Sequence, residues 1–407
     1  MTNTNLTCCV CSCFCDDIKV ELKDRKIVNI ENACLKGSSF ILKSFDQKQR
    51  SACLVNRQKV ELEEAVERAA DLLCKSQNPL IFGLGHCTLE AQVKCIEIAA
   101  RLNGAIDDYS SFGQGKLLEL IFKGALPSCS LSEIEKADLI VYWGANPQHT
   151  HPRHLSEFTY YASPRYSEIS ASRSINLCAV DIRETETAVA ASHFCRLLPG
   201  EDPDFINMIS SGVDRRLRNL NARRFIELLY NSSECVLFTG SGLVYSLNND
   251  MAPFAEMINK LDLNLKVIPM TDQPNQRGFN QALFDRTGCI NRVSFKNGIA
   301  AESKTSFLKQ VKNGQTDCIL ILGADPFSSI PFSICQDLKK IPLITIDPFI
   351  TATTAASTIV ISSAVSGLES GGTGMRMDGA RMNLTAVQDA ASLSDQKILN
   401  HILERLN

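Results

Sequence analysis

Four cysteines near the start of the chain have a spacing that could hold a metal centre. The stretch TCCVCSCFCDD contains Cys8, Cys11 and Cys15, and a further eighteen residues separate Cys15 from Cys34. Clustered thiolates on a folded-back loop can supply the four sulfurs that an iron–sulfur cubane needs. Zinc also takes four thiolates, although structural zinc more often uses two separated Cys-x-x-Cys pairs. We therefore expect an iron–sulfur site, with zinc and no metal as the alternatives.

The remaining cysteines do not suggest further chemistry. The chain has 17 cysteines in 407 residues, and most stand in apolar segments such as LLCKS, NLCAV and TDCILIL. A buried cysteine of this kind behaves as a small hydrophobic residue. The chain is long and shows no export signal, so we expect most thiols to be reduced. Cys9 and Cys13, inside the opening stretch, have no assigned task.

Two short polar loops could contribute to a ligand site. GANP and GADP each follow an apolar run that predicts a strand, and an aspartate follows the next predicted strand in each case. Open α/β sheets bind ligands at the carboxyl ends of their strands, where an acidic residue can bond a ribose or a guanine. Because neither loop has the full G-x-G-x-x-G pattern, structural turns explain them equally well. The candidate cofactor-binding residues are Gly144, Asn146, Asp181, Gly323, Asp325 and Asp347.

Three histidines in the segment NPQHTHPRH are a weaker candidate. His149, His151 and His154 are close enough in sequence to bind zinc or iron, but no carboxylate or thiol accompanies them at metal-ligand spacing. We expect these side chains to position a loop by stacking and hydrogen bonding.

The elements that carry these residues follow an α/β pattern. Residues 18–30 alternate apolar and polar side chains on both sides of Asp24 and Arg25, which predicts a β-hairpin, and residues 60–76 have helical spacing. From residue 79, short apolar strands alternate with amphipathic helices, a pattern typical of a parallel sheet covered on both faces.

The α/β pattern is duplicated within the chain. DLIVYWGANP, residues 138–147, parallels DCILILGADP, residues 317–326, and residues 180–192 parallel residues 346–358. We therefore expect two duplicated, doubly wound parallel-sheet halves with a small N-terminal cysteine-rich β unit. Chance similarity between two ordinary α/β units is the alternative.

This pattern predicts four segments along the chain. They are a cysteine-rich unit at 1–52, a first α/β domain at 53–230, a second at 231–365 and a closing segment at 366–407.

Composition excludes several classes of partner. A net charge of −3 and a pI of about 6.1 provide no basic field for nucleic acid or anionic membrane. No stretch approaches the roughly 20 apolar residues of a membrane-spanning helix, and the N-terminus lacks the pattern of a signal peptide. We expect a cytoplasmic protein without a nucleic-acid or membrane partner.

Several motifs together resemble the molybdopterin/tungstopterin oxidoreductase superfamily and, within it, the B subunit of formylmethanofuran dehydrogenase. The resemblance extends through almost the whole chain, in CVCSCFCDDIKVE, YWGANPQHTHPRH, VDIRETETA, RGFNQALFDRTG, IDPFITATTAAS and SGLESGGTGMRMDG. The last motif is the most specific. Its matching residues are Gly367, Glu369, Gly372, Thr373, Arg376, Met377, Asp378 and Gly379.

The resemblance implies two cofactors. Members of the superfamily bind a bis-pterin guanine dinucleotide with tungsten or molybdenum between two α/β halves, beside one [4Fe-4S] cluster. It implies that Cys8, Cys11, Cys15 and Cys34 ligate the cluster. It also implies that the GANP and GADP loops, with the aspartate after each following strand, lie along the dinucleotide arms.

One segment departs from the family pattern. The dehydrogenases carry a metal-ligating cysteine and then a histidine in a segment resembling Ser-Ser-Val-Cys-His-Gly, where this chain has Gly113 and Gln114. Glycine has no thiolate to donate and glutamine does not titrate, so we assign no catalytic residue to the chain. A further change, to Lys296-Asn297-Gly298 where the family has an arginine-bearing segment, also indicates that the machinery for reducing CO2 is lost.

The first hypothesis is therefore a scaffold-type B subunit, which is one that is retained in its complex without a redox role of its own. The resemblance extends to the formyltransferase/hydrolase complex of methylotrophic bacteria, in which a zinc amidohydrolase subunit releases formate from a formylated methanofuran analogue. The alternative is a redox-active tungsten or molybdenum subunit that reduces CO2 to formate, with another ligand replacing the thiolate. A third possibility is an independent nucleotide-binding or iron–sulfur module.

The resemblance also implies partners. These are an amidohydrolase-type subunit, a formyltransferase-type subunit and a small barrel subunit of the same complex. The barrel is expected on a separate chain because this sequence ends about thirty residues after its MRMDG motif. We expect the apolar tail at 390–406 to be helical and to pack on its own domain or at an interface.

Overall fold

The computed structural model describes residues 2–24, 26–159, 175–212, 219–390 and 392–406. The chain divides into two compact units, which are described separately. Unit 1 comprises Met1–Ser111, Gln273–Arg376 and Arg381–Asn407, and unit 2 comprises Phe112–Asp272 and Met377–Ala380. Within the described ranges, no helix is long and apolar enough to cross a membrane.

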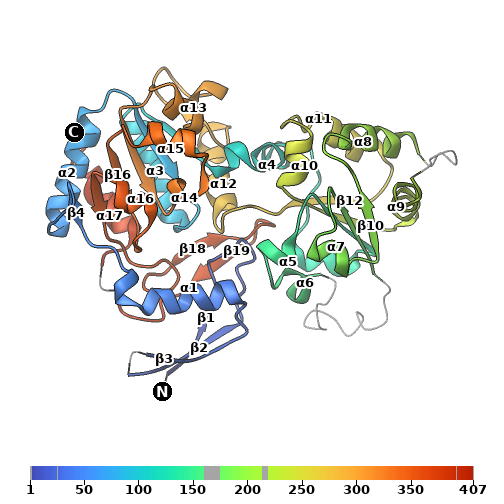
Figure 1. Cartoon of the computed structure of the whole chain (residues 1–407), viewed down its shortest axis with the longest axis horizontal. Helices are drawn as coiled ribbons and strands as arrows, with labels where there is room; N and C mark the ends of the chain where they lie inside the picture. The colour runs from blue at the N-terminus through green and yellow to red at the C-terminus, as the bar shows by residue number, and fades with distance from the viewer. Residues whose placement is uncertain (1, 25, 160–174, 213–218, 391, 407) are drawn as a thin grey trace. The chain divides into compact units, whose positions relative to one another are not determined.

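Unit 1 begins with a three-stranded antiparallel sheet. The strands are β1 (Thr2–Leu6), β2 (Ile18–Lys23) and β3 (Lys26–Glu31), and helix α1 (Leu35–Phe45) follows them (Figure 1). The expected hairpin is thus formed by β2 and β3, while Arg25 in its turn lies outside the described residues. The cysteine-rich stretch connects β1 to β2. Because these two strands pair, they hold the two ends of the stretch together.

A nine-stranded sheet forms the main layer of unit 1. Its order is β14-β13-β7-β6-β15-β16-β17-β4-β5, and the five strands from β7 to β17 are parallel. The strands are β4 (Leu54–Val55), β5 (Gln58–Lys59), β6 (Pro79–Gly83), β7 (Ala105–Asp108), β13 (Val293–Ser294), β14 (Ala300–Ala301), β15 (Cys318–Leu322), β16 (Leu343–Ile346) and β17 (Ile359–Ile361).

Helices and a short hairpin accompany this sheet. The helices are α2 (Leu62–Lys75), α3 (Leu89–Arg101), α12 (Gln276–Thr287), α13 (Phe307–Lys312), α14 (Pro326–Ser329), α15 (Phe332–Leu338), α16 (Ala352–Ala356) and α17 (Asp395–Leu403), and the hairpin is β18 (Gly372–Met375) with β19 (Arg381–Leu384). The expected helices at 60–76 and in the apolar tail correspond to α2 and α17.

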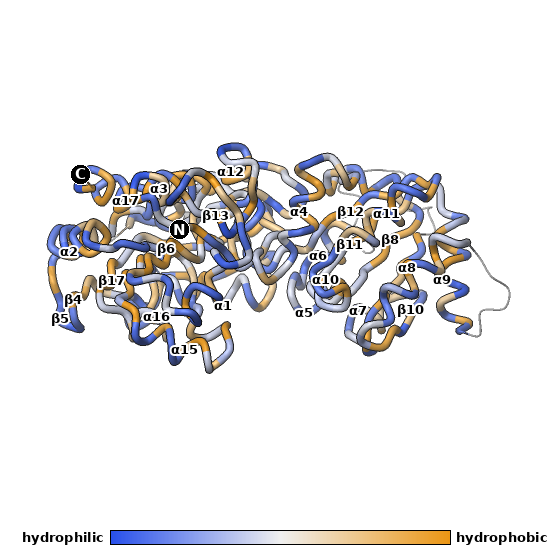
Figure 2. The backbone as a smooth tube through the Cα atoms, turned by 90° about the horizontal axis from the view of Figure 1, so that it is seen from above, coloured by the Kyte–Doolittle hydropathy of each residue, from blue (hydrophilic) through white to orange (hydrophobic). Residues whose placement is uncertain are grey.

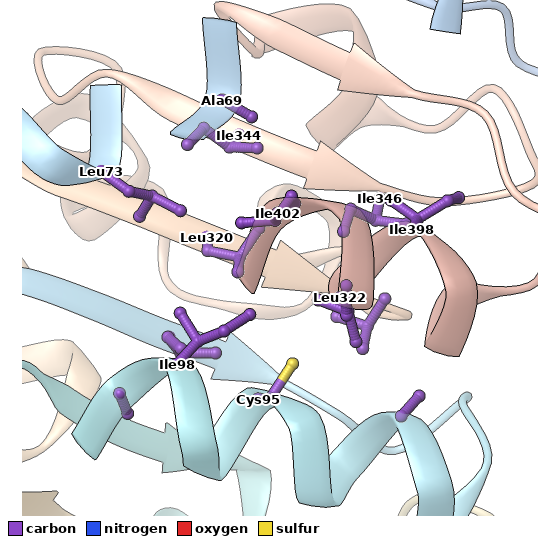
Figure 3. Close-up of a cluster of buried hydrophobic side chains, with 14 of the residues drawn as sticks. Ala69, Leu73, Cys95, Ile98, Leu320, Leu322, Ile344, Ile346, Ile398 and Ile402 are labelled. Atoms are coloured by element: carbon purple, nitrogen blue, oxygen red, sulfur yellow. The ribbon is translucent and has the colours of Figure 1, made fainter. Parts of the chain in front are cut away.

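Apolar side chains from the sheet and three helices form the core of unit 1. Figure 2 shows α2 as alternating hydrophilic and hydrophobic segments, consistent with one buried face, whereas the central strands are fully buried. Figure 3 shows the contact region of α2, α3, α17, β15 and β16. Its labelled residues are Ala69, Leu73, Cys95, Ile98, Leu320, Leu322, Ile344, Ile346, Ile398 and Ile402.

Unit 2 contains a five-stranded parallel sheet of order β10-β9-β8-β11-β12. The strands are β8 (Leu139–Trp143), β9 (Asn176–Asp181), β10 (His193–Arg196), β11 (Cys235–Thr239) and β12 (Leu265–Pro269), and the helices are α4 (Gly115–Phe122), α5 (Pro147–Thr150), α6 (His154–Glu157), α7 (Glu186–Ala190), α8 (Asp202–Ser211), α9 (Leu220–Asn231), α10 (Ser241–Ser246) and α11 (Ala252–Lys260).

The two sheets share one strand order. Strands β17-β16-β15-β6-β7 of unit 1 correspond in order to β10-β9-β8-β11-β12 of unit 2. This agrees with the expected duplication, because the two parallel segments that carry GANP and GADP form β8 and β15. The α/β fold with parallel sheets is therefore as expected.

The division of the chain differs from the expected segments at 53–230 and 231–365. Strand β11 pairs with β8, and β6 pairs with β15, so each sheet draws strands from both segments. Unit 2 is inserted in the chain between β7 and the later strands of unit 1. Parallel pairing can join strands that are far apart in sequence. Domain boundaries that assume pairing between consecutive strands therefore miss these connections.

Candidate functional site

The cysteine loop is folded back on itself by backbone hydrogen bonds. The Cys8 amide donates to the Cys15 carbonyl at 2.8 Å, and the Phe14 amide donates to the Cys11 carbonyl at 3.3 Å. Phe14 has a left-handed backbone with φ of 45°, which turns the chain between Cys11 and Cys15. These contacts bring the three cysteines of the opening stretch into one small loop.

Cys34 reaches the same loop from the start of α1. It is the N-cap residue of the helix, and its Sγ accepts a hydrogen bond from the Gly37 amide at 3.4 Å. A Cβ at Gly37 would lie 3.3 Å from Cys8 Sγ and 3.8 Å from Cys34 Sγ. Glycine at this position therefore leaves space beside the sulfurs of Cys8 and Cys34, two of the four cysteines that are predicted to be cluster ligands.

The thiols differ in their acidity. Burial raises the pKa of Cys8 well above its usual value, and the neighbouring thiols raise it further. A hydrogen bond from the Cys13 thiol lowers the pKa of Cys11 to about 7, and the nearby Lys36 ammonium contributes to the same shift. In the described parts of the chain, however, no three His, Cys, Asp or Glu side chains are grouped as metal ligands. The four cysteines are thus gathered in one region, and their role as ligands stays a prediction.

A cavity lies at the carboxyl edge of the unit 1 sheet. It has a volume of about 220 Å³ and is lined by Gly323, Asp325 and Asp347 together with residues that the sequence did not indicate. The Asp347 carboxylate accepts a hydrogen bond from the Phe349 amide at 2.8 Å, while burial raises its pKa to about 7. Other side chains that line the cavity are those of Cys9, Phe40, Lys43, Phe349, Ser366 and Asp395.

The corresponding edge of unit 2 holds a second cavity. Its volume is about 400 Å³, and Gly144 and Asp181 line it together with Asp202 and Tyr245. Burial raises the pKa of Asp181 above its usual value. Each unit thus has a cavity where the sequence predicted a ligand site.

The polar residues of the two loops anchor the chain within their own units. Asn146 Oδ1 accepts from Thr187 Oγ1 at 2.7 Å, and Asp325 Oδ1 accepts from Thr353 Oγ1 at 2.5 Å. The two hydrogen bonds match, so the loops are structurally equivalent. Asn146 Oδ1 and Asp325 Oδ1 already accept hydrogen bonds within the protein. Gly144, which has φ of 59°, is also required sterically, because a Cβ there would lie 2.3 Å from the Leu243 amide nitrogen.

Gln114 is a buried structural residue of unit 2. Its side-chain Nε2 donates to the Met270 carbonyl, and its Oε1 accepts from Thr239 Oγ1 at 3.3 Å. The side chain is fully buried and ties the start of α4 to the ends of β11 and β12. Both ends of the amide are therefore used inside the fold.

The histidine segment behaves as a packing element. His154 is fully buried with its ring centroid 4.6 Å from that of Phe238, and His151 Nδ1 lies 2.8 Å from Thr150 Oγ1. The hydrogen bond agrees with the expectation, whereas the His154 ring meets Phe238 edge-on, at an interplanar angle of 81°, and is not stacked on it.

The closing motif contains a buried ion pair. Arg50 Nη2 lies 2.7 Å from Glu369 Oε2, and their side chains are only 9% and 5% exposed. Glu369 Oε2 also accepts from the Val365 amide at 2.8 Å. Gly367, with φ of 78°, leaves space for Cys9, whose Sγ would be 3.1 Å from a Cβ at that position.

Sequence reasoning missed Asp202 and Asp395, the buried carboxyl groups of the two cavities. Asp202 starts α8 and Asp395 starts α17, so each has the sequence context of an ordinary helix N-terminus. Only the fold brings them to the sheet edge.

The comparisons with known proteins identify the relatives of the chain. No family model matches it. It is 29% identical to the B subunit of tungsten-containing formylmethanofuran dehydrogenase 2 from Methanocaldococcus jannaschii, an alignment that covers 99% of this chain and 98% of the relative. The same subunit of Methanococcus maripaludis is 27% identical over equal shares. The chain is therefore similar over nearly its whole length to formylmethanofuran dehydrogenase B subunits.

Solved structures resemble the chain in fold. The formyltransferase/hydrolase complex of Methylorubrum extorquens, crystallised with methylofuran, contains a chain with a TM-score of 0.70 and 21% identity, covering 87% of this chain and 98% of that one. Acetylene hydratase of Pelobacter acetylenicus gives a TM-score of 0.71 at 12% identity, covering 99% of this chain and 69% of that one. The chain therefore has a molybdopterin oxidoreductase-like α/β fold.

Proposed function

We propose that this B subunit is the scaffold-type, non-redox subunit of a formyltransferase/hydrolase complex in one-carbon metabolism. The complex would release the formyl group of a methanofuran-type carrier as formate, and the chemistry would take place on a partner subunit. The observation that carries the proposal is the pair Gly113 and Gln114 at the family's cysteine–histidine position.

The contacts of Gln114 support this proposal. A catalytic histidine must present a titratable nitrogen to the reacting group. The Gln114 amide does not titrate, and its two ends are engaged by Met270 and Thr239 inside unit 2. A buried residue with these contacts stabilises the fold.

We further propose that the cofactor sites of the family persist in this chain. Cys8, Cys11, Cys15 and Cys34 would hold a [4Fe-4S] cluster, for which the space beside Gly37 is consistent. The two sheet-edge cavities would hold the arms of a bis-pterin guanine dinucleotide, through Gly144 and Asp181 in one unit and Gly323 and Asp347 in the other. Such a cofactor supplies redox chemistry only with a tungsten or molybdenum ion, whose protein thiolate Gly113 cannot provide.

The expected partners follow from the same proposal. They are an amidohydrolase-type subunit, a formyltransferase-type subunit and a small barrel subunit, and the expected location is the cytoplasm. The solved complex from Methylorubrum extorquens supports a multisubunit assembly of this type.

Elemental analysis of the complex purified without oxygen tests the scaffold proposal. We expect less than stoichiometric tungsten and molybdenum and no formate-dependent dye reduction. Gly113→Cys combined with Gln114→His restores the family residues and serves as the comparison, and Gly113→Ser is the matched control. Stoichiometric tungsten or molybdenum in the unmodified complex would contradict the proposal.

The alternative is a redox-active subunit that reduces CO2 to formate. The retained cysteines favour it, as do the relatives, which are tungsten-containing dehydrogenases. A bound hydroxide, sulfide or selenide would then replace the missing thiolate. The same metal analysis separates the two functions.

A further inference from the structure

We propose that unit 1 carries a second ligand site, at the amino edge of its sheet, which binds a small hydroxylated anion such as a sugar phosphate or a sugar acid. The anionic group, a phosphate or a carboxylate, would bind Lys296, and a hydroxyl group of the ligand would donate to Gln310. The site uses no residue assigned above to a cofactor, and it goes beyond the formyl chemistry of the complex.

The site is a cavity at the amino ends of the parallel strands β6 and β7. Its volume of about 530 Å³ is within the roughly 300–1,000 Å³ of sites for small molecules, and Pro79, Gly104 and Ala105 form its buried wall. Strand β15 begins at Cys318, which pairs with Pro79, and ends just before Gly323 in the cavity of about 220 Å³. The length of this five-residue strand, roughly 16 Å, therefore separates the two cavities.

Gln310 presents an unused acceptor to this cavity. The residue belongs to α13, is 7% exposed and lines the cavity. Its Nε2 donates to the Thr305 carbonyl at 2.8 Å, whereas its Oε1 accepts no hydrogen bond from the described residues. The side chain is thus held by one end, and its oxygen is available to a donor such as a ligand hydroxyl group.

Lys296 supplies a positive charge that the fold does not neutralise. Its Nζ donates to the uncharged Asn78 Oδ1, and no carboxylate of the described ranges forms an ion pair with it. Asn78 is fixed by its own backbone, since its amide donates to Asp317 Oδ1 at 3.0 Å and its carbonyl accepts from Thr316 Oγ1 at 2.8 Å. An ammonium group has three N–H donors, so two remain for an anionic ligand.

The rest of the lining indicates a ligand with a single anionic end. Lys304 forms an ion pair with Glu302 at 2.8 Å, so with two lysines and one glutamate the lining has one net positive charge. The other polar side chains at the mouth are the amides of Asn103, Asn297 and Gln315, none of which forms a hydrogen bond with another described residue. Neutral amides both donate to and accept from hydroxyl groups, whereas an acidic peptide or a nucleic acid needs a series of cations.

Calorimetric titration of the purified complex tests the site with four probes. Glucose 6-phosphate and gluconate combine hydroxyl groups with a phosphate or a carboxylate, inorganic phosphate has the charge alone, and sorbitol has the hydroxyl groups alone. We expect one of the first two to bind at least about tenfold more tightly than either of the last two, because only it engages both Lys296 and Gln310. The tighter of the two identifies the anionic group.

Lys296→Gln is the decisive variant, because it removes the charge at an exposed position where the fold tolerates the change. Affinity for the tighter probe should fall about tenfold or more through loss of a charge-assisted hydrogen bond. Lys312→Gln removes an exposed lysine of α13 that does not line the cavity, and this matched control should leave the affinity unchanged. Hydrogen exchange should show protection by the probe at residues 294–305 and 310–315.

Three results would overturn the inference. The first is that neither glucose 6-phosphate nor gluconate binds, and the second is that inorganic phosphate binds as tightly as they do. The third is an equal loss of affinity in Lys296→Gln and Lys312→Gln, which would show a diffuse effect of charge instead of a site. None of these results bears on tungsten or molybdenum content, so the scaffold proposal stands or fails separately.

Discussion

The two sheet-edge cavities show how one fold uses the same position differently. Asp202 in unit 2 accepts hydrogen bonds from Trp143 and Ser246, whereas Asp395 in unit 1 has an open oxygen. The sheets have the same strand order, and their GANP and GADP loops make matching bonds to a threonine. The two units thus share a framework, and side chains outside the repeated motifs decide whether both oxygens of the buried carboxyl group find hydrogen-bond partners in the fold.

The largest expected effect tests how the closing motif is held in unit 1. Glu369→Gln leaves the Arg50 guanidinium buried without its counter-charge, so the free energy of unfolding should fall by about 3–5 kcal/mol. Denaturant titration measures the change. Glu302→Gln breaks the exposed pair with Lys304 and is the control, with an expected loss below about 1 kcal/mol. Equal losses would show that the buried pair has no special role.

The second prediction tests the contrast between the two carboxyl groups directly. Asp202→Ala should lower the free energy of unfolding by about 2–3 kcal/mol, because it leaves the buried Trp143 Nε1–H without an acceptor. Asp395→Asn should cost less than half of that, since Oδ1 accepts no bond from the fold. Thermal unfolding of the two purified variants distinguishes them. If Asp395→Asn were the more destabilising change, Asp395 would be a structural residue.

The third prediction concerns Gln114, the residue that supports the scaffold proposal. Gln114→Leu removes both hydrogen bonds of a buried amide and leaves the Met270 carbonyl unpaired, which should cost about 1–3 kcal/mol. Hydrogen exchange should increase at the ends of β11 and β12 in unit 2. Gln148→Leu, on a half-buried side chain of α5, provides a control in the same unit. Unchanged exchange in Gln114→Leu would weaken the proposed structural role.

The last prediction concerns a pH dependence of unit 1. Burial raises the pKa of Asp347 to about 7, above its unfolded value, so the folded state retains a proton that the unfolded state has already lost. The free energy of unfolding should therefore fall, by roughly 1 kcal/mol or more, as the pH rises from about 4 to about 7, and level off above it. Asp347→Asn should flatten this slope. The slope is measured by denaturant titration at each pH, with Asp337→Asn as the control.

Local sequence patterns predicted the elements but not their assembly. The hairpin before Cys34, helix α2 and the strands β8 and β15 follow from apolar periodicity and from the glycine turns that end the strands. The pairing of β11 with β8 does not follow, because hydrogen bonding between strands depends on topology and not on neighbouring residues.

The candidate site shows the same limit. Gly323, Asp325 and Asp347 line the unit 1 cavity as their place after strands predicted. Asn146 and Asp325 also accept a hydrogen bond from a threonine of their own unit, a contact that the sequence did not predict. Whether the four cysteines bind a cluster stays a prediction, because in the described ranges they are gathered without being grouped as ligands.

The sequence by itself determined the similarity to formylmethanofuran dehydrogenase B subunits, the duplicated α/β pattern and the presence of Gly113 and Gln114, since each depends on residue type and order. Only the tertiary structure decided that Gln114 is engaged inside unit 2 and that Asp202 is satisfied while Asp395 is not. The physical reason is that hydrogen bonding of a buried group depends on partners from distant segments, which only folding brings within about 3 Å.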